Sequence, residues 1–258
     1  MTVTDSQGRF GGADDHGTPV RLWADAFDDP DRAPRSPFDP PERLLVVGAH
    51  PDDEVLGVGG LMSQAVDAGT AATVLCLSDG RGSHPDSTTV TPDQLADIRL
   101  RELRAALTVL GVDDMVCAGL PDGGLTPLES TVHEIIAAAI GSDSGAQHTL
   151  VLAPSGFDGH PDHETVGRCA TRAAGASGTS VAHYPIWLWH WSFPGDPDIP
   201  WSTMRLHPLR PADLRRKREA IAQFPSQTRQ LSDARADRPV LPPAVLARHL
   251  RPWEALFG

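Results

Sequence analysis

The sequence has 258 residues, of which 40% are hydrophobic, and its formal net charge is −12. This length fits one large α/β domain, and no apolar run approaches the roughly 20 residues that a membrane-spanning helix needs. The acidic balance disfavours nucleic acids and anionic membranes as partners, so we expect no nucleic-acid binding and no stable membrane insertion.

The first 42 residues differ in composition from the rest of the chain. They are rich in glycine, aspartate and proline and show no sustained hydrophobic period. We therefore expect residues 1–42 to form an extended or disordered arm, held to the protein by Trp23 and Phe27. Residues 1–10 show no basic stretch followed by an apolar core, which a secretory signal would require. Together with three widely spaced cysteines, this predicts a cytoplasmic location.

From residue 43 onward, short apolar segments alternate with amphipathic ones. Such near-continuous apolar strands are typical of a parallel sheet that helices cover on both faces. The alternation predicts an α/β fold, namely a Rossmann-like, doubly wound, mostly parallel sheet within a single domain over residues 43–258. We expect strands at 44–49, 71–78, 114–118, 149–154 and 181–189, and helices at 54–68, 93–110, 127–140 and 162–174.

The C-terminal part is less regular. We expect a loop at 190–201, a strand near 203–207 and a basic helix near 211–223. Within this helix, residues 215–218 are four consecutive basic residues, which indicate a solvated face. Residues 231–258 are expected to wrap the surface, with a short helix near 243–250.

Two motifs that begin with histidine, proline and aspartate follow predicted strands. His50-Pro51-Asp52-Asp53-Glu54 follows strand 44–49, and His160-Pro161-Asp162-His163 follows strand 149–154. If the strand order is the common 3-2-1-4-5-6, the first and fourth strands are neighbours at the switch point. The two motifs then face one crevice, although they are far apart in sequence.

The residue types in these motifs suit a metal ion. The positive end of a helix disfavours protonation of His163 and leaves a lone pair for a cation. Two histidines and one aspartate around an ion leave an open position for water, as in catalytic zinc sites. Zinc lowers the pKa of bound water to about 7, and a neighbouring carboxylate can take its proton. We expect Zn²⁺ as the cofactor, with Fe²⁺ or another divalent cation as alternatives.

The two motifs resemble those of the LmbE-like, or PIG-L, family of zinc-dependent N-deacetylases. The resemblance implies a metal-dependent amidohydrolase that removes an acetyl group from the amide nitrogen of an N-acetylglucosamine-type conjugate, a small-molecule substrate. Weaker matches extend over residues 44–227: Gly59-Gly60, Ser78-Asp79-Gly80, Arg99-x-x-Glu102, Leu110-Gly111-Val112, Leu120-Pro121-Asp122 and Ser226-Gln227.

The resemblance also implies roles for individual residues of the two motifs. The metal ligands would be His50, Asp53 and His163. Asp52 would be the general base, and His160 would stabilise the oxyanion or protonate the leaving amine. For Asp162, the resemblance implies either a carboxylate partner of His160 or a group that orients the metal ligands.

Three further residues are candidates for substrate binding. Arg99 matches an arginine that contacts substrate in some members, although a salt bridge to Glu102 or a solvated helix face is the alternative, and Asp122 would lie near the sugar. Some members carry a tyrosine where this sequence has Asp158, and a carboxylate cannot stabilise an oxyanion. Either His160 and zinc suffice, or Asp158 has another role, such as binding a sugar hydroxyl.

Two other functions remain open at this point. Gly57-Val58-Gly59-Gly60 follows a strand, as the glycines of nucleotide-binding and S-adenosylmethionine-dependent Rossmann enzymes do, but its spacing does not match Gly-x-Gly-x-x-Gly. Packing of helix on sheet explains these glycines better. A non-catalytic carbohydrate- or metal-binding relative is the other alternative, which the intact Asp52 disfavours. His84-Pro85-Asp86 is expected in a loop over the cleft.

Overall fold

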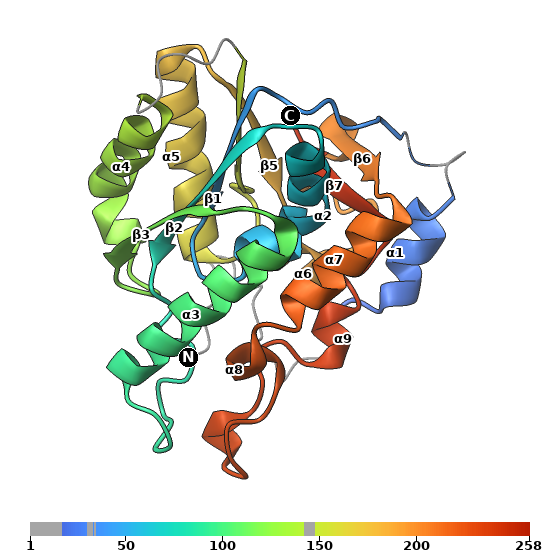
Figure 1. Cartoon of the computed structure of the whole chain (residues 1–258). Helices are drawn as coiled ribbons and strands as arrows, with labels where there is room; N and C mark the ends of the chain where they lie inside the picture. Colours follow the sequence, from blue (N-terminus) through green and yellow to red (C-terminus); the bar gives the residue numbers. More distant parts are fainter. Residues whose placement is uncertain (1–16, 30–32, 34, 142–147) are drawn as a thin grey trace.

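The computed structural model describes residues 17–29, 33, 35–141 and 148–258 (Figure 1). Within them, seven strands form one sheet in the order β3-β2-β1-β4-β5-β7-β6. The strands β1 to β5 run parallel, and β7 is antiparallel to β5 and β6. The predicted mostly parallel sheet is therefore confirmed. The strands are β1 Arg43–Gly48, β2 Ala71–Ser78, β3 Asp114–Leu120, β4 Thr149–Pro154, β5 Ser180–Tyr184, β6 Met204–Pro208 and β7 Trp253–Phe257.

Helices cover both faces of this sheet (Figure 1). The described helices are α1 Val20–Phe27, α2 Asp53–Asp67, α3 Pro92–Leu110, α4 Glu129–Gly141, α5 Pro161–Ser177, α6 Leu188–Trp191, α7 Pro211–Ile221, α8 Pro225–Thr228 and α9 Pro243–Leu246. None of them combines the length and apolar character that crossing a membrane requires.

The central strand β1 shows why this arrangement forms. Its side chains alternate between the two faces, so Leu44 and Val46 pack with α2, α3 and α7, whereas Leu45 and Val47 pack with α4 and α5. All six residues of β1 are buried. A strand that is apolar on both sides is stable only between two helical layers, which places β1 at the centre of the sheet.

The glycines after β1 are explained by close packing. A Cβ atom on Gly57 would lie 2.2 Å from Cδ2 of Tyr184, and one on Gly60 would lie 2.5 Å from Cδ1 of Leu209. These glycines therefore let α2 approach the neighbouring elements, as expected from packing of helix on sheet.

The N-terminal residues 17–29 correct the expectation of an extended arm. They contain α1, in which Trp23 is fully buried and donates a hydrogen bond from Nε1 to the carbonyl oxygen of Trp189 (2.9 Å). Phe27 stacks on Trp23 with 5.9 Å between ring centroids. The two aromatic residues make the expected contacts, but their spacing of four residues puts them on one face of a helix. Residues 1–16 of the expected arm lie outside the described residues.

The C-terminal residues correct a second expectation. Residues 253–257 do not wrap the surface but form the buried strand β7, between β5 and β6. Glu254 interrupts the apolar pattern of this strand, and its carboxylate accepts hydrogen bonds from the backbone N–H groups of Gly60 (2.9 Å) and Leu61 (2.8 Å). These groups follow Val58, whose non-helical backbone (φ −138°, ψ 21°) kinks α2. Glu254 thus replaces the acceptors that the kink removes.

The basic cluster in α7 is only partly solvated. Lys217 is 1% exposed, and its Nζ donates to Glu254 (2.6 Å) and to the carbonyl oxygen of Leu56 (2.8 Å). Arg215 and Arg218 are exposed as expected. Lys217 therefore belongs to a buried ion pair that joins α7, α2 and β7.

Replacing Lys217 with methionine is expected to lower the free energy of unfolding by about 3–5 kcal/mol, because it leaves the buried carboxylate of Glu254 without its cation. Urea denaturation measures the change. Arg218→Met, an exposed substitution in the same helix, is the matched control and should change stability by less than about 0.5 kcal/mol. Equal stabilities of the two variants would show that the ion pair contributes nothing.

Candidate active site

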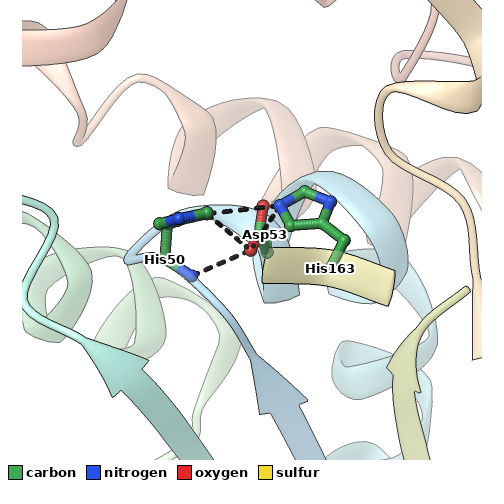
Figure 2. A group of neighbouring side chains, drawn as sticks. All are labelled: His50, Asp53 and His163. Carbon is green, nitrogen blue, oxygen red and sulfur yellow. Dashed lines mark hydrogen bonds and ion pairs between the residues drawn. The ribbon is translucent and has the colours of Figure 1, made fainter. Parts of the chain in front are cut away.

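The two motifs meet at one edge of the sheet, where β1 and β4 end side by side. Nδ1 of His50 lies 3.2 Å from Nε2 of His163. Oδ2 of Asp53 lies 3.5 Å from the first of these nitrogens and 3.2 Å from the second (Figure 2). The same oxygen accepts hydrogen bonds from the backbone N–H groups of Ala49 (3.1 Å) and His50 (2.9 Å). Two nitrogens and one oxygen therefore face a common point.

This group of side chains fits a divalent cation. All three residues are buried. The expectation that the helix end disfavours protonation of His163 is corrected: burial by itself would lower the pKa of His163, but the carboxylates of Asp53 and Asp158 raise it to about 10. The surroundings thus favour a positive charge between the rings, which a metal ion would supply. Two imidazole nitrogens and one carboxylate oxygen suit Zn²⁺ and other borderline divalent ions.

Asp158 orients one of the candidate ligands. Its Oδ2 accepts a hydrogen bond from Nδ1 of His163 at 2.6 Å, which leaves Nε2 of that ring for the ion. Asp158 is fully buried, and its two oxygens also accept from the backbone N–H groups of Ile186 (2.7 Å), Trp187 (3.0 Å) and Leu188 (3.3 Å). The expectation that Asp158 binds a sugar hydroxyl is corrected, because the carboxylate faces protein donors instead of the cavity.

The same contacts explain why β5 is shorter than predicted. The expected strand extends to residue 189, but β5 ends at Tyr184. Beyond it, the three N–H groups at 186–188 point to Asp158 instead of pairing with a neighbouring strand, and α6 follows at Leu188–Trp191.

Replacing Asp158 with asparagine is expected to weaken metal binding about 10–100-fold, because an amide is a poorer acceptor for the N–H of His163 and orients the ring less firmly. Competition with a chelator measures the affinity. Asp196→Asn is the matched control, since Asp196 is also a buried carboxylate but accepts from Ser192 in a loop outside the cavity. Unchanged affinity in Asp158→Asn would show that the hydrogen bond does not orient the ligand.

Asp52 lies beside the three candidate ligands at the start of α2. Among the described residues, it is the one non-glycine residue with positive φ (155°), a strained conformation that places its carboxylate at the cavity. Oδ2 of Asp52 accepts a hydrogen bond from Nη2 of Arg99 (3.0 Å). Burial raises the pKa of Asp52 to about 7, against the opposing effect of Arg99. A carboxyl group with a pKa near neutrality is suited to accepting and releasing a proton.

Arg99 is 3% exposed, and its hydrogen bonds fix it against the turn that carries Asp52. Besides Asp52, its guanidinium donates to the carbonyl oxygens of Pro51 and Gly80, each at 3.0 Å. Neither alternative from the sequence applies, because Arg99 is buried and its partner is Asp52, whereas Glu102 accepts from Ser226. Arg99 also lines the cavity. A contact between Arg99 and the substrate stays a prediction.

The second nitrogen of His50 faces two more predicted residues. Nε2 lies 3.2 Å from both Oδ1 of Asp122 and Oδ2 of Asp162. The oxygens of Asp162 accept from the backbone N–H groups of Gly123 (2.8 Å) and Leu125 (3.0 Å), which fixes this carboxylate. Of the two roles considered for Asp162, the contacts of its side chain fit the second, in which Asp162 orients the candidate metal ligand His50. Asp122 lines the cavity.

His160 caps α5, which begins at Pro161. Its Nδ1 accepts from the backbone N–H of Asp162 (3.2 Å), and its ring stacks on that of His163 with 4.6 Å between centroids. Burial and the adjacent His163 and His50 rings lower the pKa of His160 well below its usual range. The ring is therefore neutral and, because Nδ1 is an acceptor, carries its proton on Nε2.

A cavity of about 320 Å³ opens at this cluster. Six of the predicted residues line it, namely His50, Asp52, Asp53, Arg99, Asp122 and His160. Gln227, from the weaker match Ser226-Gln227, also lines the cavity. Sequence reasoning missed others, including Val240 and Leu241, because nothing in the local pattern indicates that these distant residues reach the site. The loop expected over the cleft is there: Ser83 and Pro85 line the cavity, and Nε2 of His84 hydrogen-bonds to the carbonyl oxygen of Arg238 (3.1 Å).

Comparison with known families agrees with the geometry. Residues 45–174, half of the chain, match the family model described as PIG-L, GlcNAc-PI de-N-acetylase. The chain belongs to the PIG-L family. The match includes the three candidate ligands as well as Asp52, Asp158 and His160, and it ends before the last three strands, β5, β6 and β7.

Individual relatives resemble part of the chain. A protein of Kineococcus radiotolerans named 1D-myo-inositol 2-acetamido-2-deoxy-alpha-D-glucopyranoside deacetylase is 31% identical over 202 residues, which cover 65% of this chain and 56% of the relative. Diacetylchitobiose deacetylase of Thermococcus kodakarensis is 29% identical over 145 residues, 55% of this chain and 52% of the relative. The chain thus spans about half the length of these relatives.

A solved structure supports the fold. The conserved protein TT1542 from Thermus thermophilus superimposes with a TM-score of 0.53 at 28% identity, over 71% of this chain and 79% of that protein. The α/β fold of this PIG-L protein therefore matches a solved fold.

Proposed function

We propose that this PIG-L protein is a zinc-dependent hydrolase that removes an acetyl group from the amide nitrogen of an N-acetylglucosamine-type conjugate. The observation that carries the proposal is the convergence of His50, Asp53 and His163 on one point, with the carboxylate of Asp52 beside them in a cavity. The names of the relatives, which act on an acetamido-glucopyranoside and on diacetylchitobiose, support this substrate class.

A divalent cation held by the three ligands would polarise the acetamide carbonyl and activate a water molecule. Asp52 accepts the proton of that water as the water attacks the carbonyl carbon, and Arg99 keeps the carboxylate in place. The protonated Nε2 of His160, on a ring that lines the cavity, donates a hydrogen bond to the developing oxyanion. The proton held by Asp52 then passes to the leaving amine, which completes the cleavage of the amide bond.

The structure favours this reaction over the two alternatives. A non-catalytic relative would not need the strained Asp52 at the cavity, since Asp52 is not one of the three converging ligands. A nucleotide-binding enzyme would need glycines that approach a phosphate, whereas Gly57 and Gly60 contact Tyr184 and Leu209. The cytoplasmic location and the choice of Zn²⁺ over Fe²⁺ stay predictions.

Release of acetate tests the proposal. Protein loaded with one equivalent of zinc is incubated with N-acetylglucosamine, its alkyl and aryl glycosides, and diacetylchitobiose, and both acetate and the free amine are quantified. We expect equimolar amounts of the two products from at least one substrate, and none after a chelator has removed the metal. A protein that holds its metal but releases acetate from none of these compounds would contradict the proposed reaction.

A further inference from the structure

The cavity has an apolar wall in addition to its charged residues. We use the name apolar wall for the six lining side chains Leu56, Pro85, Ile186, Trp187, Val240 and Leu241. Leu56, Ile186 and Leu241 are at most 3% exposed, whereas Val240 is half-buried. A substrate that offered only hydroxyl groups would leave such a surface without a matching partner, because apolar side chains form no hydrogen bonds with it.

The charges in the cavity point to an uncharged substrate. Among the described residues that line it, the cationic side chain is Arg99, whose guanidinium lies 3.0 Å from Asp52 and 3.9 Å from Asp122. The proposed cation would offset the charge of its ligand Asp53, but a phosphate or carboxylate elsewhere in the cavity would meet Asp52 and Asp122 and find no unpaired lysine or arginine among the described lining residues. Away from the metal position, electrostatics therefore disfavours an anionic group on the substrate.

Most of the apolar wall comes from outside the part of the chain that matches the family model. The model ends at residue 174, whereas Ile186 and Trp187 follow β5, and Val240 and Leu241 precede α9. The candidate ligands and Asp52 all lie within the matched part. The chemistry and the apolar wall are thus supplied by different segments, so the wall can set substrate choice without altering the reaction.

The apolar wall is held in place by specific contacts. The backbone N–H of Leu241 donates to the carbonyl oxygen of Gln227 (2.9 Å). Nearby, the buried Asp237 accepts hydrogen bonds from Thr89 and Ser232, which joins residues 231–241 to the loop that carries Pro85. On the other side, Asp158 holds the backbone of Ile186 and Trp187. A preformed wall binds a matching group with little loss of conformational entropy.

We propose that the cavity selects substrates in which an uncharged apolar group larger than methyl lies next to the scissile amide. This inference rests on the proposed function and narrows its substrate class. The group is either the acyl chain itself or an aglycone on the sugar, and both would bury apolar surface against the wall. Each buried methylene is expected to raise kcat/KM by up to about fourfold.

Two substrate series distinguish these sources. In the first, the acyl chain of glucosamine amides is lengthened from acetyl to butyryl and hexanoyl. In the second, the acetyl group is kept and the aglycone is changed from methyl to hexyl and phenyl. We expect kcat/KM to rise at least about tenfold along one series, and to fall when a carboxylate is added to its apolar group. If kcat/KM stays constant along both series while acetate is still released, the proposed role of the apolar wall is wrong and the deacetylase proposal stands.

A pair of variants ties the preference to the wall. Val240→Thr keeps the volume but places a hydroxyl group in the wall, and we expect it to reduce the gain from the apolar group about fivefold. Val116→Thr is the matched control, because Val116 is 51% exposed on β3 and lies outside the cavity. If the two variants gain equally from the apolar group of the substrate, Val240 does not contribute to its binding and the assignment of the apolar wall is wrong.

Binding provides a readout that does not depend on hydrolysis. Two pairs of compounds are titrated into the zinc-loaded Asp52→Asn protein and followed by calorimetry: hexyl and methyl β-glucoside, and N-hexanoylglucosamine and N-acetylglucosamine. The longer member of at least one pair is expected to bind at least about tenfold more tightly, and Val240→Thr should reduce this difference. Equal affinities within both pairs would overturn the inference even if no amide substrate were cleaved, whereas selective binding of a longer member without cleavage by the unchanged protein would count against the proposed reaction alone.

Discussion

Asp52→Asn is expected to lower kcat by about 10²–10⁴-fold while the protein keeps its metal. The amide has nearly the same shape as the carboxylate, and its oxygen can still accept from Arg99, which lies 3.0 Å from the present carboxylate. It cannot take a proton from water near neutral pH, so the loss falls on the chemical step. Acetate release measures kcat, and elemental analysis measures the metal content.

Asp196→Asn is the control for this variant, since it changes a buried carboxylate outside the cavity. It should retain both activity and metal. A variant of Asp52 that contains metal and is fully active would show that another group accepts the proton.

His163→Asn is expected to lose the metal and, with it, at least about 10³-fold in activity. Asparagine can keep a hydrogen bond to Asp158 in place of Nδ1, but it has no atom at the position of Nε2, which lies 3.2 Å from Asp53. The substitution thus removes the ligand atom and retains the contact that positions it. Zinc affinity, measured by competition with a chelator, should fall further than in Asp158→Asn.

His183→Asn is the matched control, because His183 lies on β5 and hydrogen-bonds to Thr171 outside the site. Its metal content and activity should be those of the unchanged protein. Zinc binding of unchanged strength in His163→Asn would exclude this histidine as a ligand.

Much of the site follows from the sequence because it depends on one topological rule. The apolar runs before His50 and His160 predict parallel strands, and the doubly wound order makes β1 and β4 neighbours. Since both motifs follow the carboxyl ends of these strands, their side chains meet at one edge. Local rules then position the ligands, because Pro161 begins α5 and His160 caps it.

Other features depend on tertiary contacts that no local pattern records. Asp158 orients His163 because three backbone N–H groups after β5 turn toward it, and nothing in its own segment predicts them. Strand β7 is not recognisable from the sequence, because Glu254 interrupts its short apolar run and makes the run resemble a surface segment. Glu254 is buried because its carboxylate has partners in the kink of α2 and in Lys217. Trp23 is similar: its helix forms because it packs against Trp189, far along the chain.

The central claim is that His50, Asp53 and His163 bind one cation, and anomalous diffraction at the zinc absorption edge tests it most directly. Crystals grown with one equivalent of zinc should show a single strong anomalous peak, about 2.0–2.2 Å from Nδ1 of His50, a carboxylate oxygen of Asp53 and Nε2 of His163. A peak at another place, or three side chains that point apart around no ion, would contradict the claim.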